Sequence, residues 1–113
     1  MLSHVVLMKV RSDLTPDERR AFVDALAVAV REVPTVKDFR VGRRVTFGAG
    51  YEQTSPDAAD FMAVIDFDDL AGLQTYLRHP AHEALGARFR QSLSSALVYD
   101  FEAGGEEFLA KLS

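Results

Sequence analysis

The sequence predicts one α+β domain in which two helical regions cover one face of a four-stranded antiparallel sheet. Three observations favour this fold class. A chain of 113 residues fits a single domain, and 48% hydrophobic residues are enough for a core. Four short β-rich runs alternate with two helical patterns in the order β-α-β-β-α-β. No internal repeat or low-complexity segment interrupts this order.

The first strand and helix are expected within residues 4–34. Residues 4–10, HVVLMKV, form a short β-rich run. The segment from Thr15 through Pro16 to Glu18 has the pattern of a capping box with proline at the first helical position, so a helix should begin at Thr15. Apolar residues then follow the helical period until Pro34 ends it, which predicts a helix of roughly 16 to 18 residues.

The middle of the chain predicts two strands separated by a loop. Residues 35–47 have β character broken by charges, and residues 48–57 are rich in Gly, Pro and Asp. Residues 60–67, DFMAVIDF, form a second continuous apolar run. Asp68 and Asp69 then provide a cap for a short helix, which should end at His79-Pro80.

The last helix and strand complete the order. Pro80 begins another helical stretch, and residues 95–101, SALVYDF, form the final apolar strand. The second helix is therefore expected in two pieces. This order is the ferredoxin-like arrangement, in which right-handed crossovers place both helices on the same face of the sheet. We expect the domain to span residues 1–102 and residues 103–113 to be a tail, packed on itself, on a lattice neighbour or on a partner subunit.

The predicted sheet is apolar on both faces. In the first strand Val6 and Met8 share the face of His4, whereas Val5 and Leu7 point the other way. Each large apolar side chain that stays exposed forgoes about 1.5–3 kcal/mol of stabilisation from burial. The helices can cover only one of the two faces. We therefore expect a homodimer whose two sheets pack face to face around an apolar, histidine-bearing cavity. The alternative is a moderately apolar face left in solvent.

Composition excludes several classes of function. The net charge is −4, and the basic residues are dispersed, which argues against a nucleic-acid partner. Without cysteine there are no disulfides and no thiolate chemistry. No apolar run approaches the ~20 residues of a membrane span, and no signal-peptide pattern is present, so we expect a cytoplasmic protein without a membrane partner.

Three histidines are the main candidates for chemistry. His4 lies in the first strand, and His79 and His82 flank Pro80 and Ala81. Histidine titrates near neutrality, and partial burial would favour its neutral, basic form. If the first strand runs beside the helix start, His4 and His82 approach one another at the mouth of one cavity.

Several segments resemble the stress-responsive dimeric α/β-barrel (Dabb) family. They cover roughly residues 3–101, and the Tyr-x-x-His-Pro-x-His element is the most specific of them. The segments are HVVLMKV at 4–10, Val41-Gly42-Arg43, YLRHPAH at 76–82 and VYDF at 98–101.

The resemblance implies a dimeric barrel without a cofactor and, in plant polyketide-cyclase members, an aldol cyclisation inside the cavity. The last histidine of the motif is the base in those members, and the preceding tyrosine holds or polarises the substrate; these positions match His82 and Tyr76. His4 matches the histidine at the pocket mouth. Leu26 and Phe61 replace two polar residues of the cyclase pocket, so the wall here is less polar. We expect the substrate-binding wall to include Val6, Met8, Phe61, Ala63, Ile65 and Val98.

Two functional hypotheses follow. In the first, the protein is a cofactor-free cyclase, lyase or isomerase acting on a small apolar carbonyl compound, with His82 as base, Tyr76 as hydrogen-bond donor and His4 in support. In the second, it is a non-catalytic stress-associated dimer or small-ligand binder, with the histidines capping the helix start. A cavity of about 300 Å³ or more with His82 and Tyr76 turned inward favours the first, and a filled cavity favours the second. A metal site made of histidines with Glu83 is a weak alternative, because Pro80 interrupts the ligand spacing.

Overall fold

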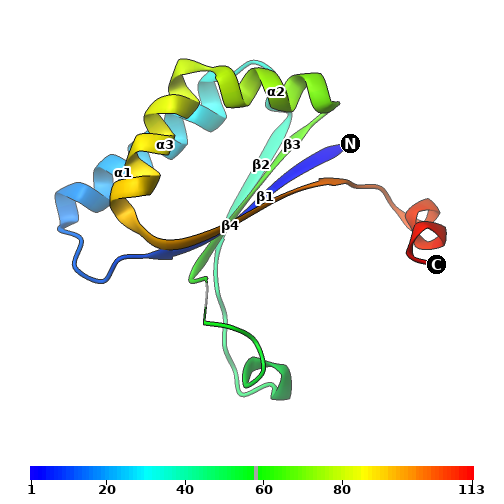
Figure 1. Ribbon diagram of the computed structural model, residues 1–113, viewed down its shortest axis with the longest axis horizontal. Coiled ribbons are helices and arrows are strands. Elements are labelled where there is room, and N and C mark those ends of the chain that lie inside the picture. Colours follow the sequence, from blue (N-terminus) through cyan, green and yellow to red (C-terminus); the bar gives the residue numbers. More distant parts are fainter. Residues whose placement is uncertain (58) are drawn as a thin grey trace.

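The computed structural model describes residues 1–57 and 59–113 and has the predicted order of elements (Figure 1). The elements are β1 (Leu2–Val10), α1 (Pro16–Glu32), β2 (Asp38–Arg43), β3 (Phe61–Phe67), α2 (Leu70–Arg78), α3 (Pro80–Ser92) and β4 (Leu93–Glu102). Two short 3-10 helices, Gly50–Glu52 and Glu106–Leu112, lie outside the sheet. The first helix has 17 residues, and the second helical region is in two pieces, as predicted.

The four strands form one antiparallel sheet in the order β2-β3-β1-β4. The α-helices α1, α2 and α3 lie on one side of it (Figure 1). The fold is therefore the α+β ferredoxin-like arrangement that the element order predicts. In the register, His4 lies between Ile65 of β3 and Asp100 of β4.

The hydrophobic core lies between the sheet and the helices of the same chain. One cluster joins α1, α2 and α3 to β3 and includes Val30, Ile65, Phe67 and Leu85. A second cluster contains Val6, Met8, Phe22 and Ala63. The prediction that the His4 face of the sheet meets the sheet of another subunit is therefore wrong, because α1 and α3 already pack on that face.

The opposite face of the sheet has no cover within the described chain. By alternation along the strands it carries Val5, Leu7, Met62, Val64, Leu97, Tyr99 and Phe101, which we call the open face. Tyr99 and Phe101 are 53% and 52% exposed, although both are large and aromatic. The prediction that the helices leave one apolar face uncovered is correct, and the face concerned is the one opposite His4.

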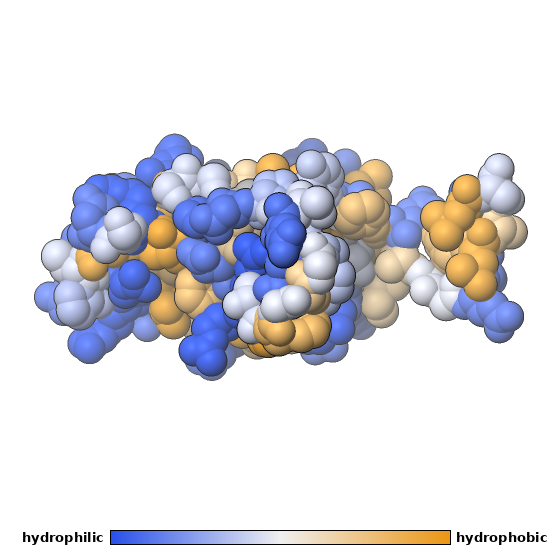
Figure 2. Space-filling model, turned by 90° about the horizontal axis from the view of Figure 1, so that it is seen from below, coloured by the Kyte–Doolittle hydropathy of each residue, from blue (hydrophilic) through white to orange (hydrophobic). Residues whose placement is uncertain are grey.

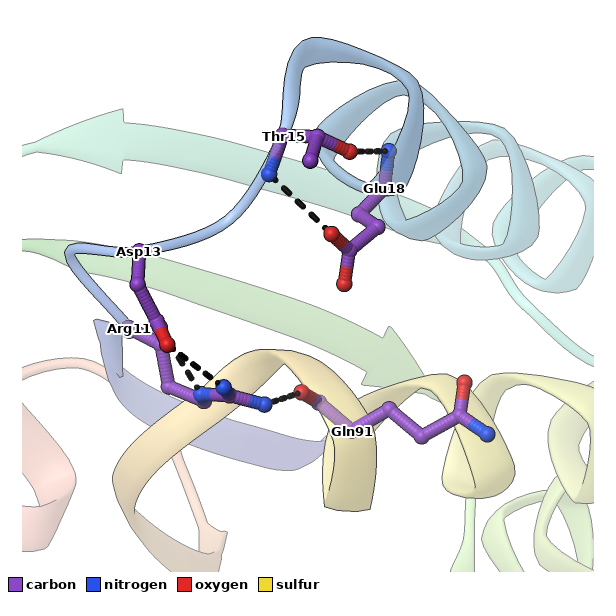
Figure 3. A network of polar contacts seen from close by, with 5 residues as sticks. All are labelled: Arg11, Asp13, Thr15, Glu18 and Gln91. Atoms are coloured by element: carbon purple, nitrogen blue, oxygen red, sulfur yellow. Dashed lines mark hydrogen bonds and ion pairs between the residues drawn. The ribbon is translucent and has the colours of Figure 1, made fainter.

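A polar network fixes the connection between β1 and α1 (Figure 3). The Arg11 guanidinium donates to both carboxylate oxygens of Asp13, at 3.1 and 2.8 Å, and to the Gln91 carbonyl at 2.8 Å. The predicted capping box is present: the Thr15 hydroxyl accepts from the Glu18 N–H, and the Glu18 carboxylate accepts from the Thr15 N–H. These bonds tie the end of β1 to the end of α3 and set where α1 begins over the sheet.

Strand β2 is shorter than predicted, and the chain after it leaves the sheet. The Glu52 carboxylate accepts hydrogen bonds from the backbone N–H groups of Phe47 and Ala49, which folds this segment back on itself. The side chains of Phe47 and Tyr51 pack together, with ring centroids 6.5 Å apart. Residues 44–57 and 59–60, which we call the arm, therefore project from the sheet (Figure 1).

The tail also projects from the body (Figure 1). Its first residue, Ala103, donates its N–H to the Met1 carbonyl at 2.8 Å, and the chain then turns away from the sheet. Leu112 is 86% exposed, and Figure 2 shows apolar side chains gathered on this projecting segment. The arm and the tail both lie on the side of the sheet away from the helices. Among the described residues, no helix is both long and apolar enough to cross a membrane.

Candidate active site

His4 is held in the middle of the sheet by a carboxylate. Its side chain is buried on the helix-facing side of β1, and its Nδ1 lies 2.6 Å from Oδ1 of Asp100 in the paired strand β4. Asp100 was not predicted as a site residue. The sequence does contain a sign of this role, because Asp100 is an acidic residue inside the apolar run VYDF. In the pairing of β4 with β1 it lies directly opposite His4, so both side chains point to the same face of the sheet.

His79 has a structural role at the junction of α2 and α3. It is the C-cap of α2 and the N-cap of α3, and its Nδ1 accepts the Ala81 N–H at 3.0 Å. Pro80 follows at the first position of α3. The structural interpretation of the motif therefore holds for His79, while His82 lies further along, in the first turn of α3.

Tyr76 lies between the two remaining histidines. It is only 1% exposed, and its ring centroid lies 4.8 Å from that of His82 and 6.0 Å from that of His4. Phe67 packs on it as well, at 5.3 Å. Within the described part of the chain the Tyr76 hydroxyl has no hydrogen-bond partner, so it is free to donate to a ligand.

Burial sets the protonation states of the two groups. It raises the pKa of Tyr76 to about 12, so the phenol is protonated at any physiological pH. Burial also lowers the pKa of His82, and the neighbouring charge of His4 adds to this effect, while a hydrogen bond with the Leu77 backbone opposes it. At neutral pH the site therefore combines a neutral imidazole with a phenol that can donate.

A pocket of about 190 Å³ joins these groups and lies between the sheet and the helices. His4, Tyr76 and His82 line it together with apolar residues. Of the predicted substrate-binding residues, this pocket is lined by Val6, Ala63, Ile65 and Val98. The pocket thus belongs to one chain and is smaller than the roughly 300 Å³ at which ligand cavities usually begin.

Met8 and Phe61 line a neighbouring cavity instead. This second cavity has about 350 Å³ and lies against α1, and Leu26 lines both cavities. Of the predicted substrate-binding residues, Met8 and Phe61 therefore lie outside the histidine pocket, in the wall of this second cavity. As for metals, no three histidine or acidic side chains come together as a possible ion site within residues 1–57 and 59–113.

Comparison with known proteins agrees with this architecture. The olivetolic acid cyclase of Cannabis sativa is 22% identical over 100 residues, which are 88% of this chain and 94% of the cyclase. The hydroxynitrile lyase of Passiflora edulis has a TM-score of 0.77 at 12% identity, covering 92% of this chain and 94% of the lyase. A dimeric ferredoxin-like protein of Thermobifida fusca has a TM-score of 0.70 at 25% identity, covering 90% of each chain.

A family model matches almost the whole chain. It is the model of the stress responsive A/B barrel domain, Dabb, and it matches residues 2–103, from the first strand to the residue after β4. The chain belongs to the Dabb family of stress responsive A/B barrel domain proteins.

Proposed function

We propose that the protein is a cofactor-free lyase, cyclase or isomerase that moves a proton next to a carbonyl group of a small substrate. The observation that carries the proposal is the convergence of His82, Tyr76 and His4 on one apolar pocket. A cyclase and a hydroxynitrile lyase among the relatives support chemistry of this class.

His82 has the properties of a general base. Its pKa is lowered by burial, so the neutral imidazole is present at neutral pH and accepts a proton from a carbon beside the carbonyl or from a hydroxyl. Negative charge then develops on the carbonyl oxygen, and Tyr76 donates its hydroxyl hydrogen bond there. In a cyclisation the enolate carbon attacks a second carbonyl carbon of the substrate, and the His82 imidazolium gives its proton to the resulting alkoxide. In a lyase reaction the deprotonated hydroxyl becomes a carbonyl as its carbon–carbon bond breaks, and the carbanion that leaves takes the proton. In an isomerisation the proton returns to a different carbon of the enolate.

His4 is placed to support the same substrate. Because the Asp100 carboxylate can only accept, the His4 ring holds a proton on Nδ1, and its Nε2 is the ring atom left for the substrate. A hydroxyl or enol group of the substrate is a suitable partner for Nε2. Asp100 is a positioning residue that acts through His4.

The small volume of the pocket favours a second candidate function. At about 190 Å³ the pocket suits a compact ligand better than a polycyclic one. In this second function the protein binds a small carbonyl compound without converting it. The two functions differ in turnover and share the ligand class.

We also infer that the protein works as a homodimer through its open face. The open face is apolar, and leaving it in water is unfavourable. The arm and the tail lie on the same side, where they frame the space for a second copy (Figure 1). The dimeric relative from Thermobifida fusca supports this arrangement. The tail would then pack on the partner subunit and cover Leu109 and Leu112.

The experiment compares turnover by matched variants. Small hydroxynitriles and β-dicarbonyl compounds are incubated with the parent protein, His82→Gln, Tyr76→Phe and His79→Asn, and cleavage or cyclisation is followed by chromatography. We expect His82→Gln to lower the rate by about 10²- to 10⁴-fold, and His79→Asn, which keeps the helix cap, to retain it. Equal rates for the parent and His82→Gln would exclude His82 as the base.

A further inference from the structure

The cavity against α1 is a second apolar chamber beside the histidine pocket. It has about 350 Å³, within the usual range for small-molecule sites. Its walls come from the sheet, from α1 and from the β1–α1 connection, and include Met8, Leu14, Phe22, Leu26 and Phe61. None of the three histidines lines it, so it is a binding space distinct from the proposed catalytic groups.

Among residues 1–57 and 59–113, the charged residues that line this chamber are two arginines. Arg19 comes from the start of α1, and Arg43 is the last residue of β2. Both are exposed, and both also line a wider depression on the surface, so they lie where the chamber opens outward. Across the described residues, neither guanidinium forms an ion pair.

The depression outside the chamber is positively charged. Its charged residues besides Arg19 and Arg43 are Lys9, Arg44, Asp57 and Asp60. The Asp57 carboxylate already forms two ion pairs, one with the Lys9 ammonium at 2.7 Å and one with the Arg44 guanidinium at 3.8 Å. Four cations thus face two carboxylates, on a protein whose net charge is −4. Such a local reversal of charge attracts anions.

We infer that this chamber binds small amphiphilic carboxylates, with the apolar body against α1 and the carboxylate against Arg19 and Arg43. A guanidinium forms paired, charge-assisted hydrogen bonds with a carboxylate, and two guanidinium groups at one opening repel each other less when an anion joins them. The apolar walls contribute through burial of the ligand's chain.

This binding goes beyond the proposed function and does not depend on it. It requires no proton transfer and no histidine. Because Leu26 lines both cavities, the bound molecule would lie next to the His82 pocket, as a substrate or as an effector.

The test is calorimetric titration of the full chain with octanoate and with 1-octanol. The two probes share the apolar chain and differ in charge. We expect octanoate to bind at least about tenfold more tightly than octanol, with an affinity that falls as salt rises. Arg19→Gln and Arg43→Gln should each weaken octanoate binding by about tenfold and leave octanol binding unchanged.

Two further variants complete the design. Arg20→Gln removes the neighbouring charge on α1, which lines neither cavity, and should bind octanoate as the parent does. His82→Gln should also bind octanoate normally, even where it loses turnover, so failure of the catalytic proposal is distinguishable from failure of this one. Absence of octanoate binding, equal affinity for the two probes, or equal effects of Arg19→Gln and Arg20→Gln would overturn the inference.

Discussion

The carboxylate of Asp100 lies 2.6 Å from Nδ1 of His4, across the pairing of β4 with β1. The histidine side chain is buried, whereas the aspartate side chain is 42% exposed. The pair therefore links the floor of the pocket to the surface of the edge strand. It also fixes the orientation of the His4 ring.

Replacing Asp100 tests this positioning role. We expect Asp100→Ala to lower kcat/KM by roughly 10- to 100-fold, because the His4 ring loses the partner that orients it. Asp100→Asn keeps an acceptor oxygen at the same place and should restore most of the loss. If Asp100→Ala has the kinetics of the parent, then His4 needs no orienting partner.

The Tyr76→Phe variant removes the hydroxyl and keeps the ring, so it separates the contributions of the two. Since the hydroxyl has no partner among the described residues, we expect the free energy of unfolding in urea to change by less than about 1 kcal/mol. The rate should fall by about 10²- to 10³-fold, as for other single donors to a developing oxyanion. Tyr76→Ala, which empties a core position, should cost about 3–5 kcal/mol. A Tyr76→Phe variant with full activity would leave the tyrosine a purely structural role.

Because of His82, both the stability and the activity of the protein should decline as the pH falls. Its pKa is lowered in the folded protein, mainly by burial. Between the ordinary histidine pKa of 6.5 and the lower pKa of folded His82, the unfolded chain binds the proton more readily than the folded chain does. The contribution of His82 to the free energy of unfolding is therefore complete above pH 6.5 and declines as the pH falls through this window. Activity should persist below pH 6.5 and fall only as folded His82 becomes protonated. Urea unfolding at several pH values should show a weaker pH dependence for His82→Gln, and an identical dependence would contradict the assignment.

A charge on the open face should break the dimer. Leu97 lies opposite Leu7 at the centre of the β1–β4 pairing and is 39% exposed in the single chain. Leu97→Glu should shift the protein from dimer to monomer in analytical ultracentrifugation, because a buried unpaired carboxylate is costly. Val28→Glu, at a 41% exposed position on α1, is the matched control and should remain dimeric. A Leu97→Glu dimer would place the interface elsewhere.

The fold was predictable because local signals agreed with one another. The capping box at Thr15, proline at the starts of α1 and α3, and the cap at Asp69 mark helix boundaries through backbone hydrogen bonds that depend on neighbouring residues only. The end of β2 was less predictable. It depends on the Glu52 carboxylate capturing the N–H groups of Phe47 and Ala49, and no periodicity encodes such a contact.

Candidate residues could be named from the sequence, but their surroundings could not. His4, Tyr76 and His82 were candidates because histidine is scarce in this chain and because the motif resembles a known one, and the structure brings the three to one pocket. The alternation of side chains along each strand predicts which strand residues share a face of the sheet. Whether helices or another subunit cover that face depends on tertiary packing. The role of Asp100 and the division into two cavities also depend on contacts between distant strands and helices.

His82 is proposed to remove a proton beside a carbonyl group of the substrate. The most direct measurement is the uptake of deuterium from D₂O into the central carbon of pentane-2,4-dione, followed by NMR with the parent, His82→Gln and His79→Asn. We expect exchange faster than in buffer alone with the parent and with His79→Asn, and exchange at the buffer rate with His82→Gln. Exchange with His82→Gln as fast as with the parent would contradict this role of His82.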